Sequence, residues 1–430
     1  MTSRKRLSIC YAAPGQNLVP SAGPTRNVLN LANALSQWAN VTVAFRSVPR
    51  ELVDSRKYKV IAIEPETAIS NPSKDDNATR GLHPFRHISY CRRLWCFSQH
   101  QASSYDVVLE KGWRLSGYLL NGFRRTGVPG VLVENNVHQW SEPLTSFRQL
   151  AKYTFHFAAH QIATHCSQRA SAVIAETPEM KTLLVRHRKL SPGTIEVVGL
   201  GVDHAVFRPM DQQAARRCLD VAPGVFLLLY VGGMDEYHDL EPVIEALAAS
   251  GQPGLELHVV GDGESRARCE EKAARAGLRA RFYGHLDHSL VPRYIAAADL
   301  CIAPYRTSAC HNGILPFSTL KIPEYMACGR AVASVSSGPI ERLIEDGVSG
   351  FLFANNVSAW ISFIKRLPTR ERLAEMGEAA AQAVDAVSWQ KTAMCYLQIC
   401  ERVVARNPGL VTDAVTRRND VTGASSFHEP

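Results

Sequence analysis

The chain has 430 residues, of which 46% are hydrophobic and 20% charged, and its formal net charge is +8. A chain of this length predicts about two or three domains, and the composition excludes global disorder. The mild positive charge fits an anionic ligand or an anionic membrane surface. No RNP, helix-turn-helix or zinc-finger spacing occurs, which argues against a nucleic-acid partner.

The cysteine pattern and the lack of long apolar runs bear on the cellular location of the protein. The eleven cysteines form no CxxC pair, a pattern typical of free thiols in a reducing compartment. The first apolar run is too short for a signal peptide, and no run approaches the ~18 apolar residues of a membrane-spanning helix. We therefore expect a cytoplasmic protein.

Short apolar runs alternate with amphipathic segments through the first half of the chain. This alternation predicts a parallel β-sheet with helices on both faces. The expected strands are Leu7–Ala12, Val41–Phe45, Val60–Ile63, Tyr105–Leu109, Gly130–Val133 and Ser171–Ala175, and the expected helices are Thr25–Gln37 and Ala151–Ala170.

A break at Gly199–Pro209 precedes a second strand–helix series. The run Val225–Val231 is continuously apolar, as expected for a strand buried on both faces. Further strands are expected at Leu255–Val260, Arg281–Tyr283, Leu300–Ala303 and Ala331–Ser334, with helices at Leu240–Ala249, Glu264–Ala276, Leu290–Ala298, Pro323–Cys328 and Ile340–Glu345. We predict an α/β protein of two doubly wound domains, with ligands in a cleft at the carboxyl ends of the strands.

The domain boundaries follow from this pattern. The first domain is expected at 1–205 and the second at 206–385. A closing helix, Trp389–Ala405, lies in the segment 386–406. The remaining residues, 407–430, are polar and without periodicity, so we expect a flexible tail.

The segment before Pro323 has the features of an anion site. Pro323 suits the first position of a helix, and loop amides at a helix start can hold a diphosphate. Lys321 can add a positive charge, and a carboxylate at Glu324 can accept hydrogen bonds from a ribose diol. On spacing alone, the alternative is that Glu324 complements the helix dipole and Lys321 is solvated.

The runs LKIPEYMACGRAV and SSGPIERLIEDGVSGFLF resemble the donor-site signature of family 4 retaining glycosyltransferases, which have the GT-B fold. Glu324 stands at the second glutamate of the family's E-x7-E motif. The resemblance implies two Rossmann-like domains facing a cleft and a C-terminal helix that crosses back to the N-terminal domain. It further implies that the first domain binds the acceptor and the second a nucleotide sugar.

Other segments extend the resemblance over the chain up to residue 405. The runs SAGPTRNVLNLANAL, YVGGMDEYHDL, ELHVVGDG and FYGHLDHSL resemble the family's glycine loops and donor-domain strands. The resemblance implies a nucleotide-sugar site formed by Gly23, Gly232, Gly233, His238, Gly261, His285, Ser318, Thr319, Leu320 and Glu324.

Four positions depart from the family pattern, of which the smallest departure is Ala331 in place of the usual proline after the glycine. Pro316 stands where the first glutamate is expected, and Gly233 and His238 stand where the family usually places Arg and Lys. Lys321 is the candidate for the missing cation, since a histidine with an ordinary pKa is mostly neutral at neutral pH. The departures leave open whether activity is lowered or abolished.

In the first domain, family resemblance places a polar residue after the strand at Gly130–Val133 close to the reacting sugar. His138 is the candidate there, with Glu134 and Asn135 close behind, and a loop histidine without a role is the alternative. The expected catalytic residues are therefore His138, Lys321 and Glu324.

Two further clusters each allow two interpretations. The run Arg80–Trp95 mixes arginines with aromatic residues, which fits either a peripheral membrane contact or a solvated helix with an apolar inner face. His156 and His160 share a helix face, but the glutamate of a HExxH motif is missing, so two stacked histidines are favoured over a metal site.

The resulting hypothesis is a metal-independent glycosyltransferase that moves a sugar from a UDP-sugar or GDP-sugar to an acceptor hydroxyl with retention of configuration. No other cofactor is expected. The acceptor is a glycan, a lipid-linked molecule or a small molecule. The alternatives are a GT-B-type UDP-sugar epimerase or phosphorylase and a non-catalytic glycosyltransferase-like binding protein.

Overall fold

The computed structural model describes residues 6–20, 22–49, 58–64, 84–137, 146–235 and 237–407. Its contacts divide the chain into two compact units. Unit 1 comprises Met1–Pro20, Pro24–Gly199 and Gln390–Pro430, and unit 2 comprises Ser21–Gly23 and Leu200–Trp389. Residues 408–430, most of the predicted tail, lie outside the described part of the chain.

Unit 1 is built on a seven-stranded parallel sheet with the strand order β3-β2-β1-β4-β5-β6-β7. Its strands are β1 (Ser8–Asn17), β2 (Asn40–Ser47), β3 (Lys59–Ala62), β4 (Val107–Lys111), β5 (Gly130–Glu134), β6 (Ala172–Ala175) and β7 (Ile195–Val197). Every residue of β4, β5 and β6 is buried, as expected for a parallel sheet covered on both faces.

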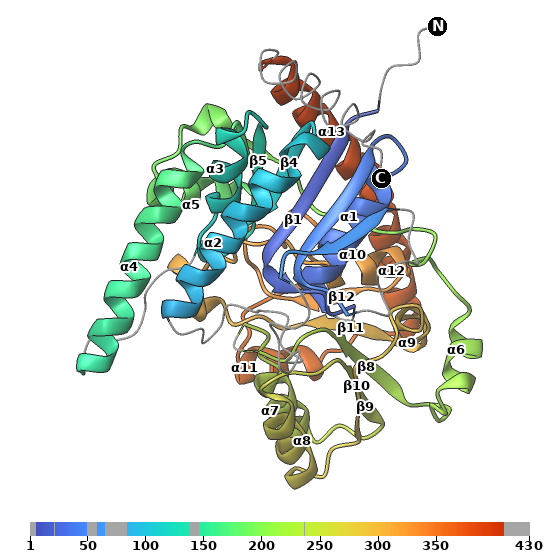
Figure 1. Cartoon of the computed structure of the whole chain (residues 1–430). Helices are drawn as coiled ribbons and strands as arrows, with labels where there is room; N and C mark the ends of the chain where they lie inside the picture. The colour runs from blue at the N-terminus through green and yellow to red at the C-terminus, as the bar shows by residue number, and fades with distance from the viewer. Residues whose placement is uncertain are drawn as a thin grey trace, which may run out of the picture. The chain divides into compact units, whose positions relative to one another are not determined.

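Helices cover both faces of this sheet (Figure 1). They are α1 (Gly23–Leu35), α2 (Pro84–Gln101), α3 (Tyr118–Arg125), α4 (Phe147–Ser167), α5 (Pro178–Arg188) and α13 (Trp389–Ala405), with short 3-10 turns at Ala102–Ser104 and Pro192–Thr194. From Gln390 onward α13 belongs to unit 1, and Thr392 Oγ1 donates a hydrogen bond to the Gly199 carbonyl at 3.1 Å. The last helix therefore returns to the first unit, as predicted.

Unit 2 has a six-stranded parallel sheet with the order β10-β9-β8-β11-β12-β13. Its strands are β8 (Phe226–Val231), β9 (Leu255–Val260), β10 (Ala280–Gly284), β11 (Leu300–Ala303), β12 (Val332–Ser334) and β13 (Gly350–Leu352). Its helices are α6 (Gln212–Cys218), α7 (Glu241–Ser250), α8 (Arg266–Arg275), α9 (Val291–Ala297), α10 (Lys321–Ala327), α11 (Val357–Ile364) and α12 (Arg370–Val384), with 3-10 turns at Thr307–Ala309 and His311–Gly313.

Alternating residues of strand β8 in unit 2 belong to two separate hydrophobic clusters. Leu228 and Tyr230 of β8 join the cluster with α7 and α8, whereas Leu229 joins the cluster with α9 and α10. Successive side chains of a strand point to opposite faces, so the two clusters cover the two faces of the sheet. This packing places the β8 carboxyl end beside the start of α10.

Several element boundaries differ from the sequence-based expectations. Helix α1 begins at Gly23 rather than Thr25, and the segment Ile340–Glu345, predicted as a short helix, forms turns. All eleven cysteines are free. Among the helices that the structure describes, none has the length and apolar character of a membrane span.

Candidate functional site

The loop after β8 lies directly against the first residue of α10. Gly232 has φ 150°, in the region that favours glycine, and a Cβ atom there would lie 2.6 Å from Lys321 Nζ. The Tyr325 hydroxyl accepts a hydrogen bond from the Val231 amide at 2.6 Å and so ties α10 to the end of β8. Glycine at 232 therefore allows an ammonium group to approach the backbone.

Lys321 is a buried cation, with 8% of the residue exposed. Its Nζ donates a hydrogen bond to Tyr230 Oη at 3.0 Å and lies 4.5 and 5.1 Å from the ring centres of Tyr230 and Tyr305. Burial lowers the pKa of Lys321 to about 7, while the charges of Asp235 and Glu324 oppose that shift. An anionic ligand beside Nζ would favour the charged ammonium.

Asp235 and His238 form a hydrogen-bonded pair in the same loop. Asp235 Oδ1 accepts hydrogen bonds from His238 Nδ1 at 2.8 Å and from the Tyr237 amide at 2.9 Å. Burial opposes ionisation of Asp235, but the hydrogen bond from His238, the Tyr237 amide and the charge of Lys321 hold its pKa below the ordinary value. Burial and the charge of Lys321 lower the pKa of His238. A neutral His238 orders this loop and adds no positive charge to it.

Arg306 lies beside this loop and was not singled out from the sequence. Its Nε donates a hydrogen bond to Asp239 Oδ2 at 3.0 Å, and its amide donates to the Tyr237 carbonyl at 2.9 Å. The signal that could have found it is its position three residues after the end of β11, where side chains of a parallel sheet reach ligands.

The segment around Glu324 differs from the prediction in where the helix begins. Helix α10 starts at Lys321, so Pro323 is its third residue rather than its first. The first four amides of a helix have no acceptor within the helix, so proline is tolerated throughout that turn. The Glu324 amide donates to the Leu320 carbonyl at 3.2 Å, and Glu324 Oε1 lies 3.8 Å from His288 Nε2. Glu324 is 8% exposed.

The remaining predicted residues of unit 2 take different positions. Thr319 is buried, and its Oγ1 lies 2.6 Å from Tyr305 Oη, while Ser318 and Leu320 are half-buried in the same loop. A Cβ at Gly261 would lie 1.9 Å from the Gly232 carbonyl oxygen, so this glycine lets two loops pack closely. His285 is exposed immediately after β10.

Of the predicted residues of the first domain, Glu134, Asn135 and Gly23 lie within the described part of the chain. His138 lies outside the described residues, so its role stays a prediction. Glu134 is fully buried at the end of β5, where burial raises its pKa to about 7 against the opposing charge of Arg188. Gly23 is exposed, and no atom lies within 4 Å of the position that a Cβ would take.

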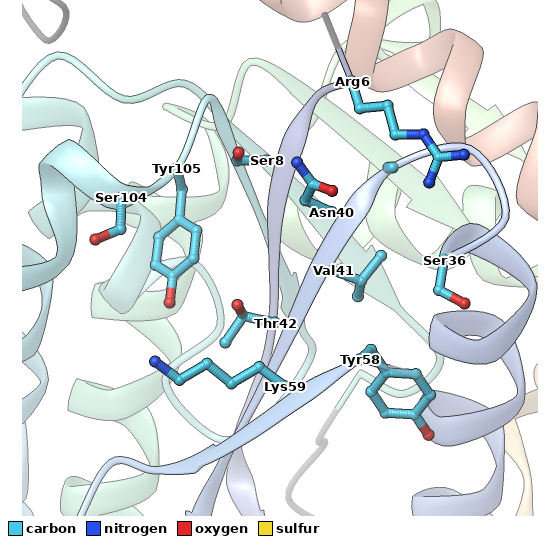
Figure 2. A pocket seen from close by; sticks show the side chains of 11 residues that line it. Arg6, Ser8, Ser36, Asn40, Val41, Thr42, Tyr58, Lys59, Ser104 and Tyr105 are labelled. Carbon is cyan, nitrogen blue, oxygen red and sulfur yellow. The ribbon is translucent and has the colours of Figure 1, made fainter. Parts of the chain in front are cut away.

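A cavity of about 340 Å³ opens at the edge of the unit 1 sheet where the strands begin, as Figure 2 shows. Ser8, Thr42 and Lys59, which line it, belong to the amino-terminal ends of β1, β2 and β3, and Tyr105 comes just before β4. Ligands of open parallel sheets bind at the carboxyl ends of the strands. This cavity therefore does not coincide with the site predicted from the sequence.

Metal-ligating side chains do not gather in the described part of the chain. No group of three or more His, Cys, Asp or Glu residues there could hold a metal ion. His156 and His160 lie four residues apart on α4. Burial and neighbouring arginine charges lower the pKa of both.

Two family models match the chain. The model described as Glycosyltransferase Family 4 matches residues 22–206, and the model described as Glycosyl transferases group 1 matches residues 225–369. Together they cover more than half of the chain. This chain belongs to the family 4 glycosyltransferases.

Curated relatives agree with this assignment. A D-inositol 3-phosphate glycosyltransferase of Geodermatophilus obscurus is 29% identical over 322 residues, which are 69% of this chain and 66% of the relative. A D-inositol 3-phosphate glycosyltransferase 2 of Catenulispora acidiphila is 27% identical over 250 residues, which are 55% of this chain and 57% of the relative. The match thus spans about half to two thirds of the length of these relatives.

Solved structures of GT-B glycosyltransferases show the same fold. Sucrose-phosphate synthase from Thermosynechococcus elongatus has a TM-score of 0.72 at 20% identity, covering 93% of this chain and 100% of that one. HepE of Anabaena in complex with UDP and glucose has a TM-score of 0.70 at 18% identity, covering 91% and 99%. The predicted GT-B fold is confirmed.

Proposed function

We propose that this family 4 glycosyltransferase moves a sugar from a nucleotide sugar to an acceptor hydroxyl, with retention of configuration and without a metal ion. The observation that carries the proposal is the buried ammonium of Lys321, which lies against Gly232 at the carboxyl edge of the unit 2 sheet. A buried cation at this edge is suited to the negative charge that develops on a leaving diphosphate.

The donor is proposed to be a UDP-sugar, with a GDP-sugar as the alternative. HepE of Anabaena was solved in complex with UDP and with UDP-glucose, which supports a uridine nucleotide. In this chain, unit 2 would bind the donor, and Glu324 would accept hydrogen bonds from the ribose hydroxyls. Unit 1 would bind the acceptor, for which glycan, lipid-linked and small-molecule classes all remain in the proposal.

The proposed chemistry is attack by the acceptor hydroxyl on the sugar face from which the diphosphate departs. The bond between the anomeric carbon and the phosphate oxygen breaks, the new glycosidic bond forms, and the hydroxyl proton passes to the leaving phosphate. Lys321 would neutralise that phosphate. Because His238 is neutral and position 233 is glycine, we propose that Arg306 supplies the second cation beside the same loop.

Thermal-shift measurements with UDP-, GDP- and ADP-sugars test the donor directly. A rise in the unfolding temperature with one nucleotide series, followed by transfer to an acceptor, would support the proposal. Turnover of the nucleotide sugar without an acceptor would favour an epimerase. Binding without transfer or hydrolysis would favour a non-catalytic binding protein.

Glu324→Ala is expected to weaken UDP binding by about 10- to 100-fold, because hydrogen bonds to a charged group contribute roughly 1.5–3 kcal/mol. Calorimetric titration with UDP measures the change. Glu378→Ala removes an exposed carboxyl from α12 and is the matched control. UDP affinity that is unchanged in Glu324→Ala would contradict the assignment of Glu324 to the ribose.

The affinity for UDP is expected to fall as the pH rises above the Lys321 pKa of about 7. Above that pH the free protein has a neutral Lys321, so binding of the diphosphate must take up a proton and loses up to about tenfold in affinity per pH unit. Calorimetry in buffers of different ionisation heat measures the proton uptake. Lys321→Arg should remove the uptake, because a guanidinium stays charged. Equal uptake in both proteins would contradict the prediction.

We propose that a peripheral membrane contact is formed by the segment Arg80–Trp95 together with helix α4. Residues 80–83 lie outside the described part of the chain, and Tyr90 is 1% exposed, so part of this segment packs inward. Helix α4 adds Phe147 and Phe157, which are 85% and 51% exposed. Helices α2 and α4 contain no acidic residue. Exposed aromatic side chains on helices without acidic residues favour binding of this face to an anionic lipid surface.

Phe157→Ser is expected to weaken binding to vesicles of phosphatidylglycerol by about tenfold or more, because burying a phenylalanine contributes roughly 1.5–3 kcal/mol. Co-sedimentation with phosphatidylglycerol and phosphatidylcholine vesicles measures it. Val348→Ser, at an exposed apolar residue of unit 2, is the control. Equal binding to both lipids, or no effect of Phe157→Ser, would rule out this surface.

A further inference from the structure

Cationic side chains gather at the carboxyl edge of the unit 1 sheet. Arg46 lies near the end of β2, and Arg114 follows the end of β4. Helices α2 and α4 add His87 and Phe155 to the same cluster. The His87 ring centre lies 5.1 Å from the Phe155 ring centre, and Arg114 Cζ lies 5.9 Å from it. One phenyl ring thus contacts both an imidazole and a guanidinium.

Arg114 carries a charge that no carboxylate of the described residues neutralises. Within the described residues, its contact is the ring of Phe155, and it makes no hydrogen bond or ion pair. The side chain is half-buried, and burial lowers its pKa, although a guanidinium remains charged in proteins. Removing a cation from water without a partner is unfavourable, and an anionic ligand would offset that cost.

His87 presents an unused polar group to the same cluster. It is 4% exposed, and its Nδ1 has no hydrogen-bond partner in the part of the chain that the structure describes. Burial, followed by the charges of Arg114 and Arg46, lowers its pKa to about 4. A neutral imidazole donates one hydrogen bond and accepts another, so His87 can bind an anion without adding a second charge.

The neighbouring charges leave this cluster positive. Glu64 Oε2 lies 2.6 Å from Arg46 Nε, and Glu64 Oε1 lies 3.0 Å from an Arg93 amino nitrogen, so two arginines share one carboxylate. Burial raises the pKa of Glu110 to about 8, although Glu110 accepts hydrogen bonds from Trp113 Nε1 and from the Gly117 and Leu120 amides. Within these described residues, Arg46 and Arg93 therefore share one carboxylate, and the charges of Arg114 and Arg46 both act on His87.

We propose that Arg114 and His87 bind an anionic group of the acceptor, a phosphate or a carboxylate, at the carboxyl edge of the unit 1 sheet. The inference rests on the proposed transferase function, for which it names the acceptor class. A guanidinium fork donates two parallel hydrogen bonds to two oxygens of either group, which orients the ligand as well as binding it. The hydroxyl that receives the sugar belongs to the same molecule.

Titration of the full chain with inorganic phosphate, and separately with acetate, tests the subsite. Saturating UDP is present so that the donor site is filled. We expect the wild type to bind at least one of the two anions, and Arg114→Gln to lower that affinity by about tenfold or more, with Arg114→Lys between them. Arg125→Gln is the matched control, because Arg125 is an exposed arginine of unit 1 that stacks on Trp95. The anion that binds distinguishes a phosphorylated from a carboxylated acceptor.

Thermal unfolding without ligand separates a binding role from a structural one. If Arg114 is a ligand-binding residue, Arg114→Gln leaves the unfolding temperature unchanged or raises it, and it abolishes the increase caused by the anion. A lower unfolding temperature with undiminished anion affinity would overturn the proposal, as would a wild type that binds neither anion. Failure of the donor proposal appears separately, as a wild type that does not bind UDP in the same samples.

Discussion

Replacing Lys321 with methionine is expected to lower kcat by about 10²–10³, the effect of removing one preorganised group that stabilises developing negative charge. Methionine keeps the length of the side chain and removes the ammonium that lies 3.0 Å from Tyr230 Oη. The fold should remain intact, because an apolar group replaces a buried cation whose pKa is already lowered to about 7 by burial. Steady-state kinetics with a UDP-sugar measure the change.

Lys365→Met is the matched control for this variant. Lys365 is an exposed lysine at the end of α11 in the same unit, so its replacement should leave kcat unchanged. Thermal unfolding of both variants shows whether the fold is retained. A Lys321→Met protein with wild-type kcat would remove the central residue of the proposed mechanism.

Gly232→Ala is expected to reduce kcat/KM by at least about 10², through displacement of the same ammonium. The added Cβ would lie 2.6 Å from Lys321 Nζ and 2.8 Å from its Cε, and φ 150° is a conformation that alanine rarely adopts. The lysine, the loop or both must move. Kinetics and UDP titration of the variant measure the loss.

Gly224→Ala separates backbone strain from the clash. Gly224 also has a positive φ, 81°, but no atom lies within 4 Å of the position of its Cβ. A loss of activity in Gly232→Ala and not in Gly224→Ala would identify the close contact as the cause.

In the double variant Gly232→Ala/Lys321→Met, the two losses should not add, because both act on one ammonium. Full additivity would mean that the two residues act independently.

The departures at Gly233 and His238 have a coherent account in the structure. Gly233 and His238 do not supply the cations expected from the family, because one has no side chain and the other is a neutral ring bonded to Asp235. Arg306 lies beside the same loop through its bond to Asp239. Pro316 still removes a carboxylate from the predicted sugar contacts, and no described side chain has been assigned to replace it.

Local sequence patterns determined the architecture of this chain. The continuous apolar run Val225–Val231 and its counterparts predicted parallel strands buried on both faces, because burial depends on the residues of each strand themselves. The motif around Glu324 predicted family 4, and the family models confirmed it. The helix at Ile340–Glu345 was wrong and the start of α10 was misplaced by two residues, since short helical turns depend on their packing.

Tertiary structure decided which side chains act together. Lys321 and Gly232 are far apart in sequence, and their contact exists because β8 ends and α10 begins at the same edge of one sheet. The lowered pKa of Lys321 and the contact of the Arg114 guanidinium with Phe155 likewise depend on residues distant in the chain. Burial and charge pairing are sums over neighbours in space, so residue order alone does not contain them.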